Sequence, residues 1–160
     1  MSDQPTIDKA LLTLKIVVSA LLAGVVMTWA VILVVSRSVP DRPELTGLLS
    51  TILLVFAVIA TVLPIPLYRP MVNKARQAIA NAPAGTDPAG IAMRHLQPYT
   101  LISAALGESL GLFAAVVYLL TRYQSAMLMA VLGIILIVRQ FPTRRQLDTF
   151  LADAREKGSA

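Results

Sequence analysis

The chain has 160 residues, of which 56% are hydrophobic and only 14% carry a charge. Soluble domains have about a quarter charged residues, so this composition is typical of a protein whose solvent is lipid. The net charge of +5 does not indicate a nucleic-acid binder, because the basic residues flank apolar runs instead of gathering on one polar surface. There is no cysteine and a single histidine, which excludes disulfides and argues against a metal site.

The first two apolar runs are each long enough to cross a bilayer as a helix. The first run, 16–35, follows a segment that carries Asp3, Asp8 and Lys9, and no small-x-small cleavage site comes after it. We therefore predict a retained span and not a signal peptide. The second run, 48–67, contains closely spaced prolines near its end, and we expect the helix to kink or stop there, at the inner interface.

A polar connection of about 30 residues separates the second run from the third. Within it, residues 71–82 favour a helix, and the Pro- and Gly-containing stretch 82–90 predicts a flexible turn. The third run, 99–120, is interrupted only by Glu108. Because lipid offers no partners to backbone polar groups, we expect each full span to be α-helical.

The fourth run is short for a transmembrane span. Its apolar centre, 126–138, extends to about 124–140 only with the polar residues at its ends. Arg122 and Arg139 could reach the headgroups from there. We predict a fourth span, and a re-entrant segment is the alternative.

The tail, 142–160, has the pattern of an amphipathic helix. Thr143-Arg-Arg-Gln146 has the form of a capping box, and apolar residues then recur at helical spacing: Leu147, Phe150, Leu151 and Ala154. We expect this helix to lie on the inner headgroups, and a docking helix for a partner protein is the alternative.

The distribution of Lys and Arg predicts the orientation. With both termini inside, 11 basic residues lie on the inner side and 3 on the outer side, namely Arg37, Arg42 and Arg122. We predict an all-α, polytopic protein of the cell membrane with four transmembrane helices in residues 1–141, a C-terminal amphipathic helix, and cytoplasmic N- and C-termini.

Glu108 is the only acidic residue inside a predicted span, and it lies near the expected bilayer midplane. A charged group at that depth costs about 2.5 to 3.5 kcal/mol on insertion scales, and this cost indicates that Glu108 has a structural or functional role. No Lys or Arg lies inside the apolar runs 16–35, 48–67 or 126–138, so these runs offer Glu108 no cationic partner. Proton exchange and an interhelical hydrogen-bond clamp both remain open as its role.

Small residues surround this acid along the same helix. Ala104, Gly107, Gly111 and Ala114 recur at i, i+3, i+7 and i+10, which places them on one face. Such stripes let helix backbones approach closely, so we predict that these four residues mediate helix packing. Glu108 follows Gly107 directly and should lie at the edge of that interface.

The segment from 94 to 120 resembles the ion-binding helix of the rotary ATP synthase proteolipid, subunit c. In that family a basic loop containing Gln-Pro precedes a helix with the pattern Ala-Leu-x-Glu-[Ala/Ser] and a later aromatic. The matching residues here are Arg94, Gln97, Pro98, Ala105, Leu106, Glu108, Ser109 and Phe113.

The resemblance implies that Glu108 is an ion-binding carboxyl and that Ser109 matches a ligand of the sodium-type members. Those members also take a glutamine from their first helix, and 48–67 contains none. The resemblance therefore implies a proton as the bound ion.

Two hypotheses of function follow. The chain is an oligomeric, proton-handling membrane subunit that uses Glu108, or it is a structural or assembly protein in which Glu108 and the small residues only pack helices. A small transporter or a holin-like pore would need a row of polar residues across several spans, and the predicted spans contain few such residues. We expect no enzymatic activity and no cofactor, because a lone Glu offers no acid–base pair. The expected partners are the lipid bilayer, further copies or a membrane complex, and a proton, with no nucleic acid.

Overall fold

The computed structural model describes residues 4–83, 86–141, 143 and 151–152. Within these residues the chain forms helices and their connections and no β-strand, which confirms the all-α prediction. The elements in chain order are α1 (Gln4–Val35), the short 3-10 helix η1 (Pro43–Leu45), α2 (Thr46–Val62), α3 (Pro64–Ala80), α4 (Pro88–Thr121) and α5 (Ser125–Arg139).

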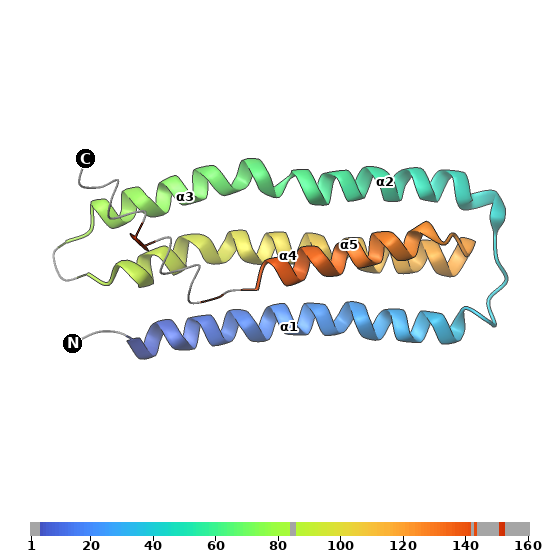
Figure 1. The fold of residues 1–160 in the computed structure, drawn as a ribbon, viewed down its shortest axis with the longest axis horizontal. Coiled ribbons are helices and arrows are strands. Elements are labelled where there is room, and N and C mark those ends of the chain that lie inside the picture. The colour runs from blue at the N-terminus through green and yellow to red at the C-terminus, as the bar shows by residue number, and fades with distance from the viewer. Residues whose placement is uncertain (1–3, 84–85, 142, 144–150, 153–160) are drawn as a thin grey trace.

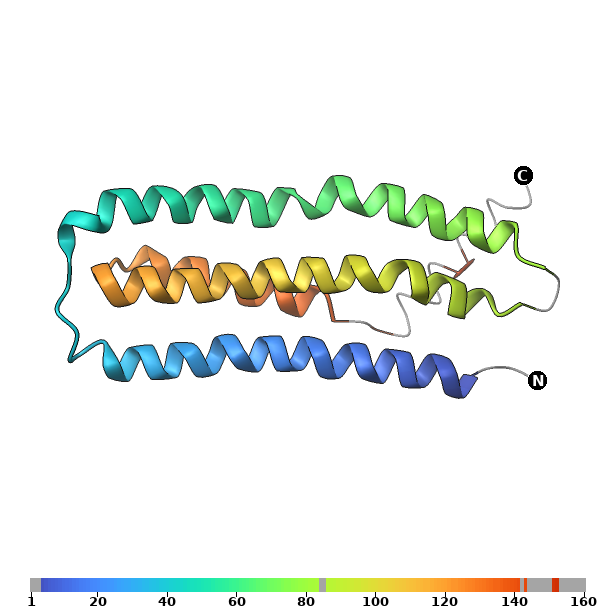
Figure 2. The same ribbon diagram turned by 180° about the vertical axis from the view of Figure 1, so that it is seen from behind.

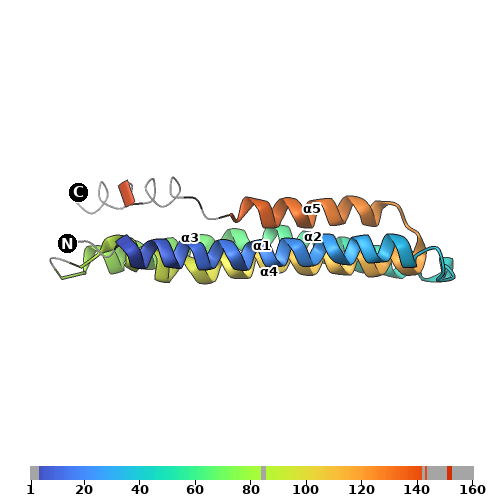
Figure 3. The ribbon, with the colours of Figure 1, turned by 90° about the horizontal axis from the view of Figure 1, so that it is seen from below.

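Three long rods form one layer, and α5 lies across one side of it. In Figures 1 and 2 α4 runs between α1 and the α2–α3 rod, and Figure 3 shows α5 above this layer. The N-terminus of α1 and the α3–α4 turn lie at one end of the bundle. The 36–42 connection and the α4–α5 turn lie at the other end. The layer face opposite α5 is not covered by any described helix (Figures 2 and 3).

Three helical segments are long and apolar enough to cross a membrane: Asp8–Val35, Pro43–Ala80 and Pro88–Thr121. The fourth predicted span corresponds to α5, an apolar helix of 15 residues. At 1.5 Å per residue α5 is about 22 Å long, which is shorter than a hydrocarbon core of about 30 Å.

All three long rods extend beyond the predicted spans at the end that carries the N-terminus. The first helix begins at Gln4 and not at 16, and the third long segment begins at Pro88 and not at 99. The polar segments remain helical because their few apolar residues pack against one another. Their buried apolar cluster contains Leu11, Leu14, Ala89, Ala92 and Met93, with Ile79 of α3 packed against it.

The prolines after the second apolar run interrupt the helix without ending it. The break is the single residue Leu63, after which Pro64 begins α3 and Pro70 lies inside it. Proline is tolerated in the first turn of a helix because the N–H that it lacks has no helical partner there. The predicted kink or stop is therefore a short interruption in one rod of 38 residues.

The predicted amphipathic tail helix falls largely outside the described residues. Of this segment the structure describes Thr143, Leu151 and Ala152. Leu151 is half-buried and packs against the apolar cluster formed by the N-terminal parts of α1 and α4.

Arg122 links the two connections at the far end of the bundle. It caps α4 with a left-handed backbone, at a φ of 55°. Its Nη2 donates a hydrogen bond of 2.9 Å to the carbonyl of Val39, and its guanidinium carbon lies 6.0 Å from the Tyr118 ring centroid. The N–H of Arg42 donates to the carbonyl of Leu120, so the 36–42 connection is bound to the end of α4 twice.

We expect Arg122→Ala to lower the free energy of unfolding by about 2 kcal/mol, because it removes a charge-assisted hydrogen bond. Arg122→Gly loses the same bond but adopts the left-handed backbone without strain, so it should cost about 1 kcal/mol less than the alanine variant. Unfolding by sodium dodecyl sulfate in mixed micelles, followed by circular dichroism, measures both. Equal stability of the two variants would contradict the role of the backbone conformation.

Candidate functional site around Glu108

The helix that carries Glu108 is held on three sides, because α4 packs against α1, α5 and the α2–α3 rod. Its contact with α5 is the closest. A Cβ added to Gly107 would lie 2.9 Å from the carbonyl oxygen of Gly133, and one added to Gly133 would lie 2.6 Å from the carbonyl oxygen of Gly107. Ala104, Gly107, Gly111 and Ala114 are all buried. The small-residue face of α4 is thus occupied by helices of the same chain.

The contact between α4 and α1 is fixed by an aromatic side chain. Trp29 donates a hydrogen bond of 3.1 Å from Nε1 to the carbonyl oxygen of Gly111, and its ring centroid lies 5.5 Å from that of Tyr118. Val25 lies against Gly111, where an added Cβ would meet its Cγ1 at 2.8 Å. These contacts set the register of α1 against α4 within one turn of Glu108.

The Glu108 carboxyl lies against α1 at Gly24. A Cβ added to Gly24 would lie 3.5 Å from Oε1 of Glu108, which is ordinary van der Waals contact. Glu108 is half-buried. Across the described part of the chain, its carboxyl has no hydrogen bond and no ion pair. Because glycine has no side chain, position 24 places no side-chain carbon against this carboxyl oxygen.

Ser109 lies elsewhere. Its side chain is exposed and lines an apolar hollow of about 340 Å³ with Ile52, Phe56 and Phe113. Adjacent residues of a helix point about 100° apart, and here the two side chains face different neighbours. Glu108 faces α1, whereas Ser109 faces α2.

The surroundings of Glu108 contain no other charged side chain. Residues 16–35, 46–67 and 125–138 include no Asp, Glu, Lys, Arg or His. Nor does any group of three or more His, Cys, Asp or Glu side chains gather in the described residues to hold a metal ion. What the arrangement offers is a single carboxyl that can accept or donate one proton, held in an otherwise apolar layer.

Sequence patterns identified Glu108 but not the residues that position it. Gly24 belongs to a weak small-residue stripe of the first run, with Ala20 and Thr28, and nothing in that stripe indicates that it faces the acid. Trp29 reads from the sequence as packing bulk, and its hydrogen bond to a helix carbonyl carries no sequence signal.

No family model, no curated protein and no solved structure matches this chain.

Proposed function

We propose that this chain is a four-span membrane protein that handles protons, with Glu108 as the group that binds and releases the proton. It works in this proposal as an oligomer or as a subunit of a membrane complex, with both termini in the cytoplasm. The three long apolar helices support membrane insertion. The excess of basic residues at the end of the bundle with the N-terminus supports the orientation.

One observation carries the role of Glu108: its carboxyl is half-buried in an apolar layer and has no partner among the described residues. A carboxyl that only clamped two helices of this chain would hydrogen-bond across their interface. This one lies against Gly24 of α1, where no side chain of α1 meets it. Because Glu108 is only half-buried, a proton donor or acceptor of a neighbouring chain, or water, can reach its carboxyl.

The depth of Glu108 agrees with this role. The rings of Tyr68 and Tyr99 pair at 5.2 Å between centroids, and such aromatic residues mark a membrane interface. Glu108 lies nine residues beyond Tyr99 along α4, which is about 14 Å. Half of a hydrocarbon core is about 15 Å, so the carboxyl would be near the midplane. The resemblance of this segment to the proteolipid helix supports the same role.

The second candidate function is an assembly protein, in which Glu108 hydrogen-bonds to a neighbouring copy or subunit. The observation that favours it is the occupied small-residue face of α4, which leaves the half-buried Glu108 carboxyl as a polar group that a neighbour could bind. The two functions differ in what a neutral amide does at position 108, since glutamine still hydrogen-bonds but cannot exchange a proton.

Chemical labelling tests proton exchange directly. The full chain is reconstituted in vesicles and treated with dicyclohexylcarbodiimide, which is apolar and reacts with protonated carboxyls, and the adduct is located by mass spectrometry. We expect an adduct at Glu108 whose rate of formation falls as the pH is raised. Glu108→Gln should remove the adduct and abolish proton-coupled activity while the protein still inserts and assembles.

Glu44 provides the matched control, because it is a second glutamate, exposed and located in η1 before α2. Glu44→Gln should leave the labelling unchanged. An unreactive Glu108 in a correctly folded protein, or a rate that is independent of pH, would contradict proton exchange. Glu108→Gln that labels nothing yet retains every activity would favour the assembly function.

A further inference from the structure

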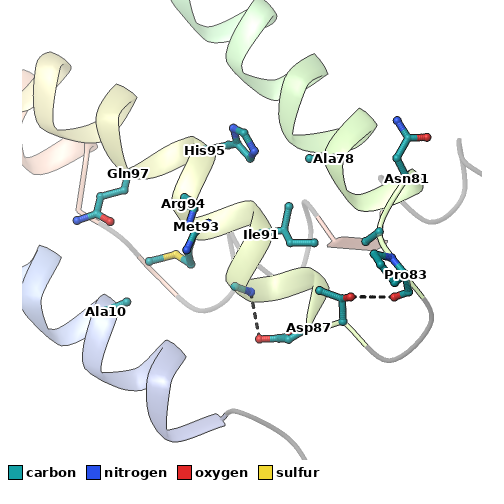
Figure 4. A pocket seen from close by; sticks show the side chains of 13 residues that line it. Ala10, Ala78, Asn81, Pro83, Asp87, Ile91, Met93, Arg94, His95 and Gln97 are labelled. Atoms are coloured by element: carbon teal, nitrogen blue, oxygen red, sulfur yellow. Dashed lines mark hydrogen bonds between the residues drawn. The ribbon is translucent and has the colours of Figure 1, made fainter.

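A second candidate site lies away from Glu108, at the end of the bundle that carries the N-terminus. A cavity of about 850 Å³ opens there between the N-terminal part of α1, the end of α3 and the first turns of α4 (Figure 4). Gln97 is the lining residue nearest to Glu108 in the chain, and the step of 11 positions from one to the other corresponds to about 16 Å of helix. The cavity is therefore separate from the Glu108 site.

The wall of this cavity is rich in hydrogen-bond donors. Arg94, His95 and Gln97 project from α4, and Asn81 contributes a carboxamide from the end of α3. Arg94 is exposed, and within the described ranges its guanidinium has neither an ion pair nor a hydrogen bond. A cation with free donors beside neutral donors fits an anion that has several oxygen acceptors.

Asp87, the one acidic residue among those that line the cavity, already accepts hydrogen bonds from the backbone. Asp87 caps α4, and its two carboxylate oxygens accept hydrogen bonds from the N–H groups of Ala89, at 3.0 Å, and Gly90, at 3.1 Å. Its charge is thus compensated by the start of the helix. Arg94 remains as the uncompensated charge of the cavity.

Most of the other lining residues are apolar, and they come from α1, α3 and α4. Met93 is buried and lies on the side of α4 toward Ala10, whereas His95 lies on the side toward α3 (Figure 4). Ile91 adds a further apolar side chain. A ligand that fits both parts of the wall has an anionic group and an apolar portion next to it.

The depth of the cavity identifies the source of such a ligand. If Tyr68 and Tyr99 mark the inner interface, Gln97 lies about 3 Å and Arg94 about 8 Å beyond it along α4. The headgroup layer of a leaflet is about 5 to 8 Å deep. Arg94 would therefore lie at the level of lipid phosphates.

We propose that this cavity binds the phosphate of an anionic phospholipid of the inner leaflet, with Arg94 as the charged contact and Gln97, three residues along the same helix, as a further donor. This site rests on the membrane placement in the proposed function, but not on proton exchange by Glu108.

Lipid titration tests the site. The full chain in mild detergent is titrated with phosphatidylglycerol or phosphatidylcholine, and bound lipid is counted by native mass spectrometry. We expect phosphatidylglycerol to bind about tenfold more tightly, the size of one charge-assisted contact. Arg94→Gln should remove this preference. Arg69→Gln is the matched control, because it removes the same charge from an exposed residue that does not line the cavity.

Three other outcomes would contradict the proposed lipid site. Equal binding of the two lipids would exclude an anionic headgroup, and equal loss in both arginine variants would indicate general surface attraction. Displacement of phosphatidylglycerol by inorganic phosphate at millimolar concentration would indicate a soluble phosphate as the ligand. Glu108→Gln should bind phosphatidylglycerol as the wild type does, so failure of proton exchange and failure of lipid binding are distinguishable.

Discussion

Gly133→Leu should separate α5 from α4 and lower the free energy of unfolding by at least about 3 kcal/mol. Even the first added carbon atom would lie 2.6 Å from the carbonyl oxygen of Gly107 and 2.9 Å from the backbone nitrogen of Gly111. Both obstacles are backbone atoms of a helix, so no rotamer change relieves them, and the two helices must move apart. Gly133→Ala should already cost about 2 kcal/mol for the same reason.

The matched control is Gly47→Ala near the start of α2, where an added Cβ meets nothing within 4 Å. This variant should be neutral or more stable by up to about 1 kcal/mol, because alanine is the better helix former. Unfolding in mixed micelles, followed by Trp29 fluorescence and by circular dichroism, measures both variants. A Gly133→Leu protein as stable as the Gly47→Ala protein would disprove the close α4–α5 contact.

Trp29→Ala should lower the free energy of unfolding by about 3 kcal/mol, the lower end of the cost of truncating a packed aromatic residue. The indole packs against two of the buried clusters, one shared by α2, α4 and α5 and one shared by α1, α4 and α5. It also donates the hydrogen bond to Gly111. Trp29→Phe keeps much of the packing and loses the hydrogen bond, so it should cost about 1 kcal/mol.

Met27 lies two residues away on α1 and is 67% exposed, so Met27→Ala should change stability by less than about 0.5 kcal/mol. Trp29 is the one tryptophan of the chain, so its variants give no tryptophan fluorescence. Circular dichroism therefore follows the unfolding of these variants. A similar cost for Met27→Ala and Trp29→Ala would mean that the indole does not fix α1 against α4.

The hydropathy of the chain predicted the helices but not their ends. The run 16–35, and the run 99–120 apart from Glu108, are predominantly apolar all round, which suits lipid and is visible directly in a sequence. The extensions of α1 and α4 are more polar, with Asp8, Lys9 and Lys15 in the first and Arg94 in the second. Their helical state depends on a buried stripe that includes Leu11, Leu14 and Met93, and each of these is buried by a residue distant in the chain.

The candidate site was predictable in part for the same reason. An acid in an apolar run is visible without a structure, and so is a stripe of small residues on its helix. The neighbours of each face are not visible, because they depend on how the helices are arranged. Gly107 packs against α5, Glu108 faces Gly24 of α1, and Ser109 faces α2, although the three residues are consecutive.

The central position of α4 also has a consequence for biosynthesis. In the described part of the chain α1 does not pack directly against α2 or α3, and α4 and α5 supply the contacts between them. The first two apolar helices emerge from the ribosome before their common partner exists. In the proposed membrane placement, each of them must be stable in lipid without that partner, and the lack of charged residues in 16–35 and 46–67 favours this. The helix with the acid enters last among the three rods, when the surface that receives Glu108 is already in the membrane.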